Sequence, residues 1–187
     1  PPELTNSVGL PLEEGLVVVR NVLQGAGLRD KIKIIASGKV SSGFSLVRTL
    51  ALGADATNAA RAFMMSIGCI QALKCNTNKC PTGIATQDKN LQYGLDPTDK
   101  HVRAYYFHKK TVQAAADIVG IMGYTSFSQV SGDDIMRRVQ RSQVRTLSEL
   151  FPEVEPGCLL EGKGPERLQA LWDCCGTDDA VTRRWIL

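Results

Sequence analysis

Cys69-Ile-Gln-Ala-Leu-Lys-Cys75-Asn-Thr-Asn-Lys-Cys80-Pro-Thr-Gly-Ile-Ala-Thr-Gln87 carries three cysteines at C-x5-C-x4-C spacing, and a proline follows the last of them. Cysteine thiolates are the soft ligands that hold iron–sulfur clusters, and such runs often close on a Cys-Pro pair. Three ligands instead of four suit a cluster of three irons. The polar insert 76–78 disfavours helix and leaves backbone N–H groups free to point at sulfur. The stretch therefore predicts an iron–sulfur site with Cys69, Cys75 and Cys80 as ligands.

The spacing alone leaves two other interpretations open. The three cysteines could be small buried apolar residues, or they could form a Cys3His zinc site completed by His101 or His108. Both histidines fall on a predicted long helix, seven positions apart, and neither has a ligand-like spacing to the cysteines. This disfavours the zinc module without removing it.

Composition excludes several classes of protein. The chain has 187 residues, 43% hydrophobic and 22% charged, with a net charge of +3, as expected for a globular protein with a sizeable core. Basic and acidic residues are interspersed, so no basic stripe indicates nucleic acid. No apolar stretch approaches the roughly 18 residues of a membrane span. The start at Pro1 without methionine is typical of a piece of a longer protein.

The remaining cysteines indicate the redox environment. Cys158, Cys174 and Cys175 lie far from the first group in sequence, and adjacent cysteines do not readily bridge each other. No even framework of half-cystines is present, which favours a reducing compartment and a cytoplasmic location.

Upstream of the cysteines, helices and strands alternate. Pro11 begins a helix that ends at Gly25–Gly27, and residues 32–36 are predicted as a short buried strand. A helix then runs from Phe44 to Gly53, residues 54–60 form a weaker strand, and Arg61 begins another helix. Strand–helix alternation with short loops predicts an α/β fold with a parallel sheet, either doubly wound or closed into a barrel.

Downstream, the pattern is mostly helical. A long helix is predicted from Asp96 to about Gly123, with Tyr105 and Tyr106 on its core face. Residues 126–139 are predicted as a short capped helix and residues 165–174 as another. Trp172 and Trp185 are expected to anchor this tail.

Two loops at the ends of the predicted strands suit a phosphate group. Ser37-Gly38-Lys39 follows the first strand and Arg61 follows the second. In a β/α barrel the loops after the last two strands bind phosphate through backbone N–H groups, and a nearby cation adds charge-assisted hydrogen bonds.

Residues 35–40, 51–55, 68–75 and 80–87 together resemble the FMN-binding synthase domain of glutamate synthase, in order and almost without gaps. The likeness covers roughly residues 1–125. It implies the C-terminal portion of a (β/α)8 TIM barrel over residues 1–125, followed by a mostly helical extension over residues 126–187. Since a whole barrel takes about 250 residues, the earlier strands would lie before Pro1.

The resemblance also implies a chemistry. Ser37, Gly38, Lys39, Ala60 and Arg61 match the FMN phosphate site, and a 3Fe–4S cluster would be held by Cys69, Cys75 and Cys80. Electrons would pass from ferredoxin or a nicotinamide-dependent partner subunit through the cluster to FMN. The flavin would then reduce 2-iminoglutarate, made from 2-oxoglutarate and glutamine-derived ammonia, to glutamate.

The chain departs from the pattern of the family in three respects. Ser37 stands where FMN barrels commonly have an acidic residue, and Asn58 and Ala60 lie where a glycine is usual. The family's substrate-binding residues lie mostly before Pro1, so no catalytic residue is assigned within this chain. The alternatives are a related FMN and iron–sulfur barrel oxidoreductase with a different substrate, and the non-catalytic zinc-binding module.

Overall fold

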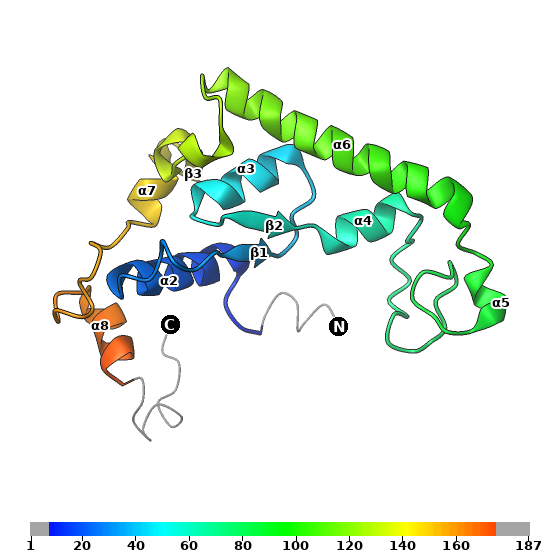
Figure 1. Cartoon of the computed structure of the whole chain (residues 1–187), viewed down its shortest axis with the longest axis horizontal. Helices are drawn as coiled ribbons and strands as arrows, with labels where there is room; N and C mark the ends of the chain where they lie inside the picture. The colour runs from blue at the N-terminus through cyan, green and yellow to red at the C-terminus, as the bar shows by residue number, and fades with distance from the viewer. Residues whose placement is uncertain (1–7, 175–187) are drawn as a thin grey trace.

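The computed structural model describes residues 8–174 and is a mixed α/β structure, shown in Figure 1. The order of elements is α2 (Leu12–Gly25), β1 (Ile35–Ser37), α3 (Gly43–Ala51), β2 (Ala56–Asn58), α4 (Ala60–Ser66), α5 (Lys89–Gln92) and α6 (Pro97–Ile121), then the 3-10 helices η1 (Phe127–Gln129) and η2 (Gly132–Asp134), β3 (Met136–Gln140), β4 (Gln143–Thr146), α7 (Leu147–Leu150) and α8 (Glu166–Asp173).

β1 and β2 pair in parallel, with α3 as the crossover between them. Ser42 begins α3 with a capping box, in which its hydroxyl accepts from the amide of Ser45 and the Ser45 hydroxyl accepts from the amide of Ser42. The register sets Ser37 opposite Asn58, so the loops that follow the two strands leave the same edge of the sheet. The predicted strand–helix alternation is confirmed, while a barrel stays a prediction.

Both strands are shorter than predicted. The strand predicted over 32–36 is observed at Ile35–Ser37, because the amide of Ile32 bonds to the carbonyl of Leu28 in a turn after α2. The strand predicted over 54–60 is observed at Ala56–Asn58. Asp55 accounts for the later start, since its side chain binds the amide of Ile34.

The main core lies between α2, the parallel strands, α3 and α6, and α6 runs across α3 and α4 in Figure 1. Gly43 lets the start of α3 approach the backbone of α6 closely, because a Cβ there would lie 2.6 Å from the backbone nitrogen of Ala115. Ile135 and Leu147 from the C-terminal segment are buried in the same core. Its fully buried members include Val47, Leu52 and Leu147.

The long helix is confirmed as α6, but the prediction that Tyr105 and Tyr106 face the core was wrong. Their side chains are 57% and 52% exposed, and the two rings contact edge to face with centroids 5.3 Å apart. α6 contacts α3 and α4 through a narrow stripe that includes Phe107 and Ala115, and the tyrosines lie outside it. Within residues 8–174 no helix has the length and apolar character needed to cross a membrane.

The predicted helix over 126–139 was also wrong. That region contains η1, η2 and the first strand of an antiparallel hairpin, in which Arg137 lies opposite Arg145. The extension is therefore not mostly helical as far as Thr146. The second predicted helix is confirmed as α8, and Trp172 on it packs against a small cluster that includes Leu159. Trp185 lies outside the described residues.

Candidate functional site

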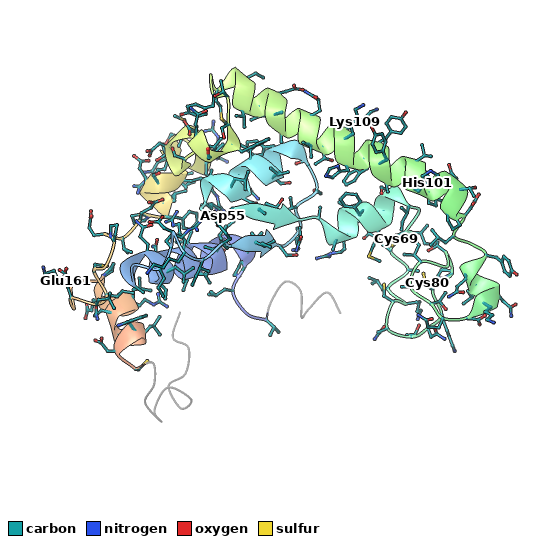
Figure 2. The ribbon with its side chains drawn as sticks, viewed as in Figure 1. Asp55, Cys69, Cys80, His101, Lys109 and Glu161 are labelled. Atoms are coloured by element: carbon teal, nitrogen blue, oxygen red, sulfur yellow. The ribbon has the colours of Figure 1, made fainter. Side chains whose placement is uncertain are left out.

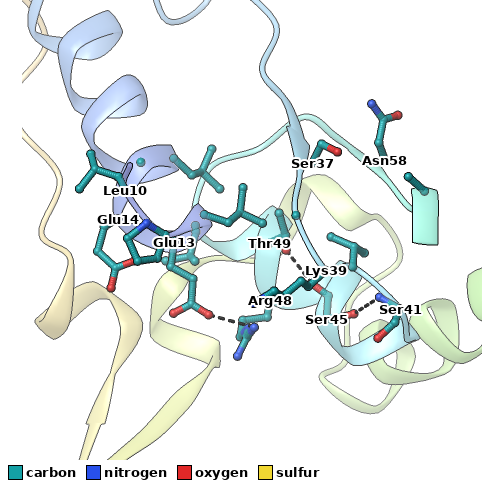
Figure 3. Close-up of a pocket in the computed structure, with 18 of the residues that line it drawn as sticks. Leu10, Glu13, Glu14, Ser37, Lys39, Ser41, Ser45, Arg48, Thr49 and Asn58 are labelled. Carbon is teal, nitrogen blue, oxygen red and sulfur yellow. Dashed lines mark hydrogen bonds and ion pairs between the residues drawn. The ribbon is translucent and has the colours of Figure 1, made fainter. Parts of the chain in front are cut away.

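A surface cavity of ≈ 1070 Å³ opens at the carboxyl edge of the parallel sheet (Figure 3). It is lined by the ends of both strands, by the start of α2 and by one side of α3. All five residues predicted for the phosphate site line it, namely Ser37, Gly38, Lys39, Ala60 and Arg61. The structure thus brings together two loops that are separated by more than twenty positions in the sequence.

The loop after β1 owes its shape to local features. Lys39 has φ of +55°, a left-handed conformation that is uncommon for a residue with a side chain. Gly38 lies against the first turn of α2, where a Cβ would come within 3.1 Å of Leu12. Val40 is buried beneath the loop, while the amide of Ser41 donates to the Ser45 hydroxyl. These contacts place the loop at the cavity rim.

Ionic side chains that the sequence prediction missed complete the cavity wall. Glu13 accepts from Arg48 at 2.9 Å through one carboxylate oxygen and from Arg137 at 3.1 Å through the other. Figure 3 shows the Glu13–Arg48 pair beside Lys39. The three residues come from α2, α3 and β3, so their only signal in the sequence was the charge of each residue.

The wall as a whole is cationic. Lys39, Arg48, Arg61 and Arg137 oppose two carboxylates, those of Glu13 and Glu14. Hydroxyl groups of Ser37, Ser41 and Ser45 also line the cavity. Cations and hydroxyl donors are the groups that bind phosphate oxygens, so the donor chemistry fits a phosphate-bearing ligand.

The three predicted cluster ligands lie on the loop between α4 and α5, on the far side of α4 from the cavity loops (Figure 2). Cys69 is half-buried, Cys75 is exposed and Cys80 is buried. The Cys69 sulfur accepts a weak hydrogen bond from the amide of Gln71 at 3.4 Å.

Cys80 has the environment of a thiolate. Its sulfur lies 3.4 Å from the Thr82 hydroxyl, and this contact, with amide hydrogen bonds from Ala85, Thr82 and Ile84, lowers its pKa to about 7 against the opposing effect of burial. Hydrogen bonds that favour the charged form lower a thiol pKa, and the thiolate is the form that binds metals.

Hydrogen bonds centred on Thr86 hold together the two ends of the loop that contains Cys80. The Thr86 hydroxyl donates to the carbonyl oxygen of Asn78 at 2.7 Å and accepts from the amide of Asp88. The Asn78 side chain accepts from the amide of Gln87 at 2.6 Å. Gly83 has φ of +77°, and a Cβ there would lie 2.5 Å from the carbonyl oxygen of Leu91. This explains why the loop needs glycine and threonine at these two positions.

The cysteines suit an iron–sulfur cluster in residue type, in spacing and in the lowered thiol pKa of Cys80. The positions of their sulfur atoms do not suit one. Among residues 8–174 no group of three or more cysteine, histidine or acidic side chains is gathered closely enough to hold a metal ion. The zinc alternative meets the same obstacle. His101 Nδ1 lies 2.8 Å from the carbonyl oxygen of Pro97 on its own helix, and His108 lines a smaller cavity beside Phe63.

Comparison with known proteins now identifies the family. Residues 1–125 match the model described as the conserved region in glutamate synthase. A glutamate synthase large subunit-like protein, YerD, of Bacillus subtilis is 36% identical over 80% of this chain and 28% of its own length. An archaeal glutamate synthase [NADPH] of Methanocaldococcus jannaschii is 33% identical over 71% of this chain and 26% of its own. A ferredoxin-dependent glutamate synthase of Synechocystis is 32% identical over 74% of this chain and 8% of its own.

The chain spans less than a third of the length of each of these relatives. The matched region contains both cavity loops and all three cysteines of the loop between α4 and α5. The resemblance seen in the sequence is confirmed, and this chain belongs to the glutamate synthase family.

Proposed function

We propose that this chain is part of a glutamate synthase-type oxidoreductase, which forms L-glutamate from 2-oxoglutarate and glutamine-derived ammonia. The observation that carries the proposal is the family match over residues 1–125, which includes two loops that meet at one cationic cavity. The relatives' names point to NADPH in one case and ferredoxin in another as the source of electrons. Either donor, acting directly or through a partner subunit, is compatible with the proposal.

We further propose that β1, α3, β2 and α4 are the last units of a (β/α)8 barrel. The support is their parallel pairing with a helical crossover, and the position of the cavity at the carboxyl edge of the strands. In barrels of this kind the loops at that edge form the active site.

The residues present fit FMN at its phosphate end. Lys39 and Arg61 would neutralise phosphate charge, and the Ser37 and Ser41 hydroxyls would donate hydrogen bonds to its oxygens. The cavity is large enough for a ligand of this size, since such sites are typically about 300–1,000 Å³. When bound, FMN would supply the hydride that reduces the imine of 2-oxoglutarate and ammonia.

For the 3Fe–4S cluster, we propose Cys69, Cys75 and Cys80 as ligands and derive no electron-transfer step. Their sulfurs are not gathered in this structure, so cluster binding would have to reshape the loop between Cys69 and Cys80. Coupling of metal binding to local folding is usual when a site is not preformed. The described cysteines are all free thiols, which is compatible with the proposed cytoplasmic location.

The test uses the full-length protein, purified anaerobically after iron and sulfide reconstitution. We expect flavin absorbance, about three irons per chain and a three-iron EPR signal. Turnover with 2-oxoglutarate and glutamine or ammonia is expected to exceed turnover with other 2-oxo acids. Flavin and iron with preference for another oxo acid would instead support the related oxidoreductase, and one zinc per chain without iron would support the zinc module.

The cysteine assignment has a matched control within the chain. Cys69→Ser, Cys75→Ser and Cys80→Ser should each lower the iron and sulfide content. Cys158→Ser should leave both unchanged, because Cys158 packs with Val154 and Leu159 in the separate C-terminal cluster. Equal iron content in all four variants would remove these ligands from the proposal.

A further inference from the structure

The C-terminal segment, outside the family match, contributes a charged residue to the cavity. Arg137 on β3 lines it, and its guanidinium lies 3.1 Å from a carboxylate oxygen of Glu13. Residue 137 is beyond the matched region, which ends at residue 125. The hairpin therefore reaches back to the start of α2, across more than a hundred positions of sequence.

Glu13 links this arginine to another. Its second oxygen lies 2.9 Å from Arg48 on α3, and its side chain is only 19% exposed. Arg48 Nε is buried and has no hydrogen-bond partner among the described residues. The ion pair with Glu13 therefore orients the Arg48 guanidinium in the cavity wall.

Strand geometry separates Arg137 from its neighbour. Successive side chains on a strand point to opposite faces, so Arg138 points away from Arg137. Arg138 donates to the carbonyl oxygen of Arg141 at 2.7 Å within the hairpin turn, and it is not among the residues that line the cavity. The two arginines carry the same charge and lie on the same strand, but of the two only Arg137 contacts Glu13.

We propose that Arg137 and Glu13 are positioning residues that hold Arg48 in an anion-binding wall of the cavity, for a ligand that carries a phosphate group. The proposal rests on the proposed function in that the phosphate is taken to be that of FMN. It adds that the C-terminal hairpin, through Glu13, sets the affinity of this site.

Glu13 separates positioning from simple charge. Glu13→Gln raises the net charge of the wall by one, so long-range electrostatics alone would make phosphate bind more tightly. If Glu13 instead holds Arg48 in place, the same change frees the guanidinium and binding weakens. The sign of this one effect decides between the two mechanisms.

The experiment titrates flavin-free full-length protein with FMN, followed by quenching of flavin fluorescence, and separately with inorganic phosphate as competitor. We expect Arg137→Gln and Glu13→Gln each to weaken FMN binding by roughly 3- to 10-fold, the range for charge-assisted contacts at a partly exposed site. Arg137→Lys should recover part of the loss. Arg138→Gln, the matched control, should bind as wild type does, and the melting temperatures of the two glutamine variants at 137 and 138 should agree.

The outcomes are distinguishable from failure of the proposed function. Unchanged FMN affinity in Arg137→Gln, equal losses in Arg137→Gln and Arg138→Gln, or tighter binding in Glu13→Gln would each overturn the inference while leaving FMN binding intact. If wild type bound inorganic phosphate with the expected dependence on Arg137 but did not bind FMN, the inference would stand for the anion and the proposed cofactor would fall. Wild type that bound neither would overturn both.

Discussion

Asp55 joins the starts of the two parallel strands. Its carboxylate accepts from the amide of Ile34 at 2.8 Å and pairs with Arg29 at 2.9 Å and Lys33 at 3.3 Å. Burial by itself would raise the Asp55 pKa, but the Ile34 amide and the two cations together hold it below its usual value. The folded protein therefore favours the carboxylate, and the lowered pKa is a contribution to stability.

Replacing Asp55 tests this contribution. Asp55→Asn should lower the free energy of unfolding at pH 7 by about 1–3 kcal/mol, the usual cost of losing hydrogen bonds to a charged group. Because the folded pKa is depressed, the stabilisation is present above the unfolded pKa and is lost as pH falls through the folded pKa. Urea denaturation of the full-length protein at neutral and increasingly acid pH measures both effects. Asp30→Asn, at an exposed position, is the control, and equal stability of the two variants would contradict the prediction.

Arg20 is the residue by which α2 holds the C-terminal segment. It is 4% exposed and donates to the carbonyl oxygens of Leu52 at 3.2 Å and Phe151 at 3.1 Å, while Glu153 lies 3.3 Å away. Burial lowers the Arg20 pKa, and Glu153 acts in the opposite direction. The guanidinium thus joins α2, the end of α3 and residues 151–153.

Arg20→Met keeps most of the side-chain volume and removes every donor. Because two carbonyl groups lose their partner, unfolding should become easier by roughly 2–4 kcal/mol. Limited proteolysis should also cut the segment after residue 146 faster than in wild type. Arg103→Met, at an exposed position on α6, should change stability by less than about 0.5 kcal/mol. If Arg20→Met lowered the free energy of unfolding by as little as Arg103→Met does, Arg20 would not anchor the segment.

At the scale of the element, α2 is packed tightly at its C-terminal end and loosely near its N-terminal end. At its C-terminal end the carbonyl oxygens of Gln24 and Gly25 accept from the amides of Gly157 and Leu159, so the later segment caps the helix. A Cβ at Gly25 would lie 2.6 Å from the Leu159 side chain, whereas one at Gly15 would meet only Leu10 at 3.7 Å.

The same substitution at these two glycines should have opposite effects. Gly25→Ala should destabilise the full-length protein by about 1–3 kcal/mol, because Leu159 is almost fully buried and has little room to move. Gly15→Ala should stabilise it by about 0.5–1 kcal/mol, because alanine favours helix where the space is open. Thermal unfolding of the two variants checks the signs, and destabilisation by both would show that the Leu159 contact is not the cause.

The elements that the sequence predicted well are those with local signals. Pro11 and the glycines near residue 25 bound α2, and Asp96-Pro97 begins α6 with its side-chain cap on the amide of Thr98. The hairpin lacked such a signal, since every residue of β3 is exposed and no alternation of apolar and polar residues marks it. Its position depends on contacts with distant residues.

The residues of the candidate site also divide into those with a local signal in the sequence and those placed by distant contacts. Ser37-Gly38-Lys39 and Arg61 could be predicted because parallel strands bring their following loops to one edge. Glu13, Arg48 and Arg137 could not, because their contacts join three elements far apart in sequence. The cysteines were predicted as one ligand set, yet residue type and spacing do not specify how a loop arranges its sulfurs, and the structure does not gather them.

At the scale of the whole molecule, the parallel sheet has apolar surface without a partner in the described chain. β1 and β2 each pair with one neighbouring strand, and the side chain of Ile35 is 63% exposed. Phe44 on α3 and Met65 on α4 are also about half exposed. Exposed strand edges with apolar side chains are normally covered in a native protein. In the proposed barrel, closure would remove both edges of the sheet, and the side chains of the other strands would cover its exposed face.

Hydrogen exchange in the full-length protein tests this arrangement. If the barrel closes, β1 and β2 each have a neighbouring strand on both sides, so the amides of residues 35–37 and 56–58 are all hydrogen-bonded. They should then exchange as slowly as those of the buried face of α6, near Ala115 and Val119. The hairpin of β3 and β4 provides the internal comparison, because its strands form a separate two-stranded sheet with β3 exposed throughout, and it should exchange faster. Similar, fast exchange in both sheets would show that β1 and β2 keep their open edges in the whole protein, and the barrel would then have to be replaced by an open α/β sheet around the same cavity.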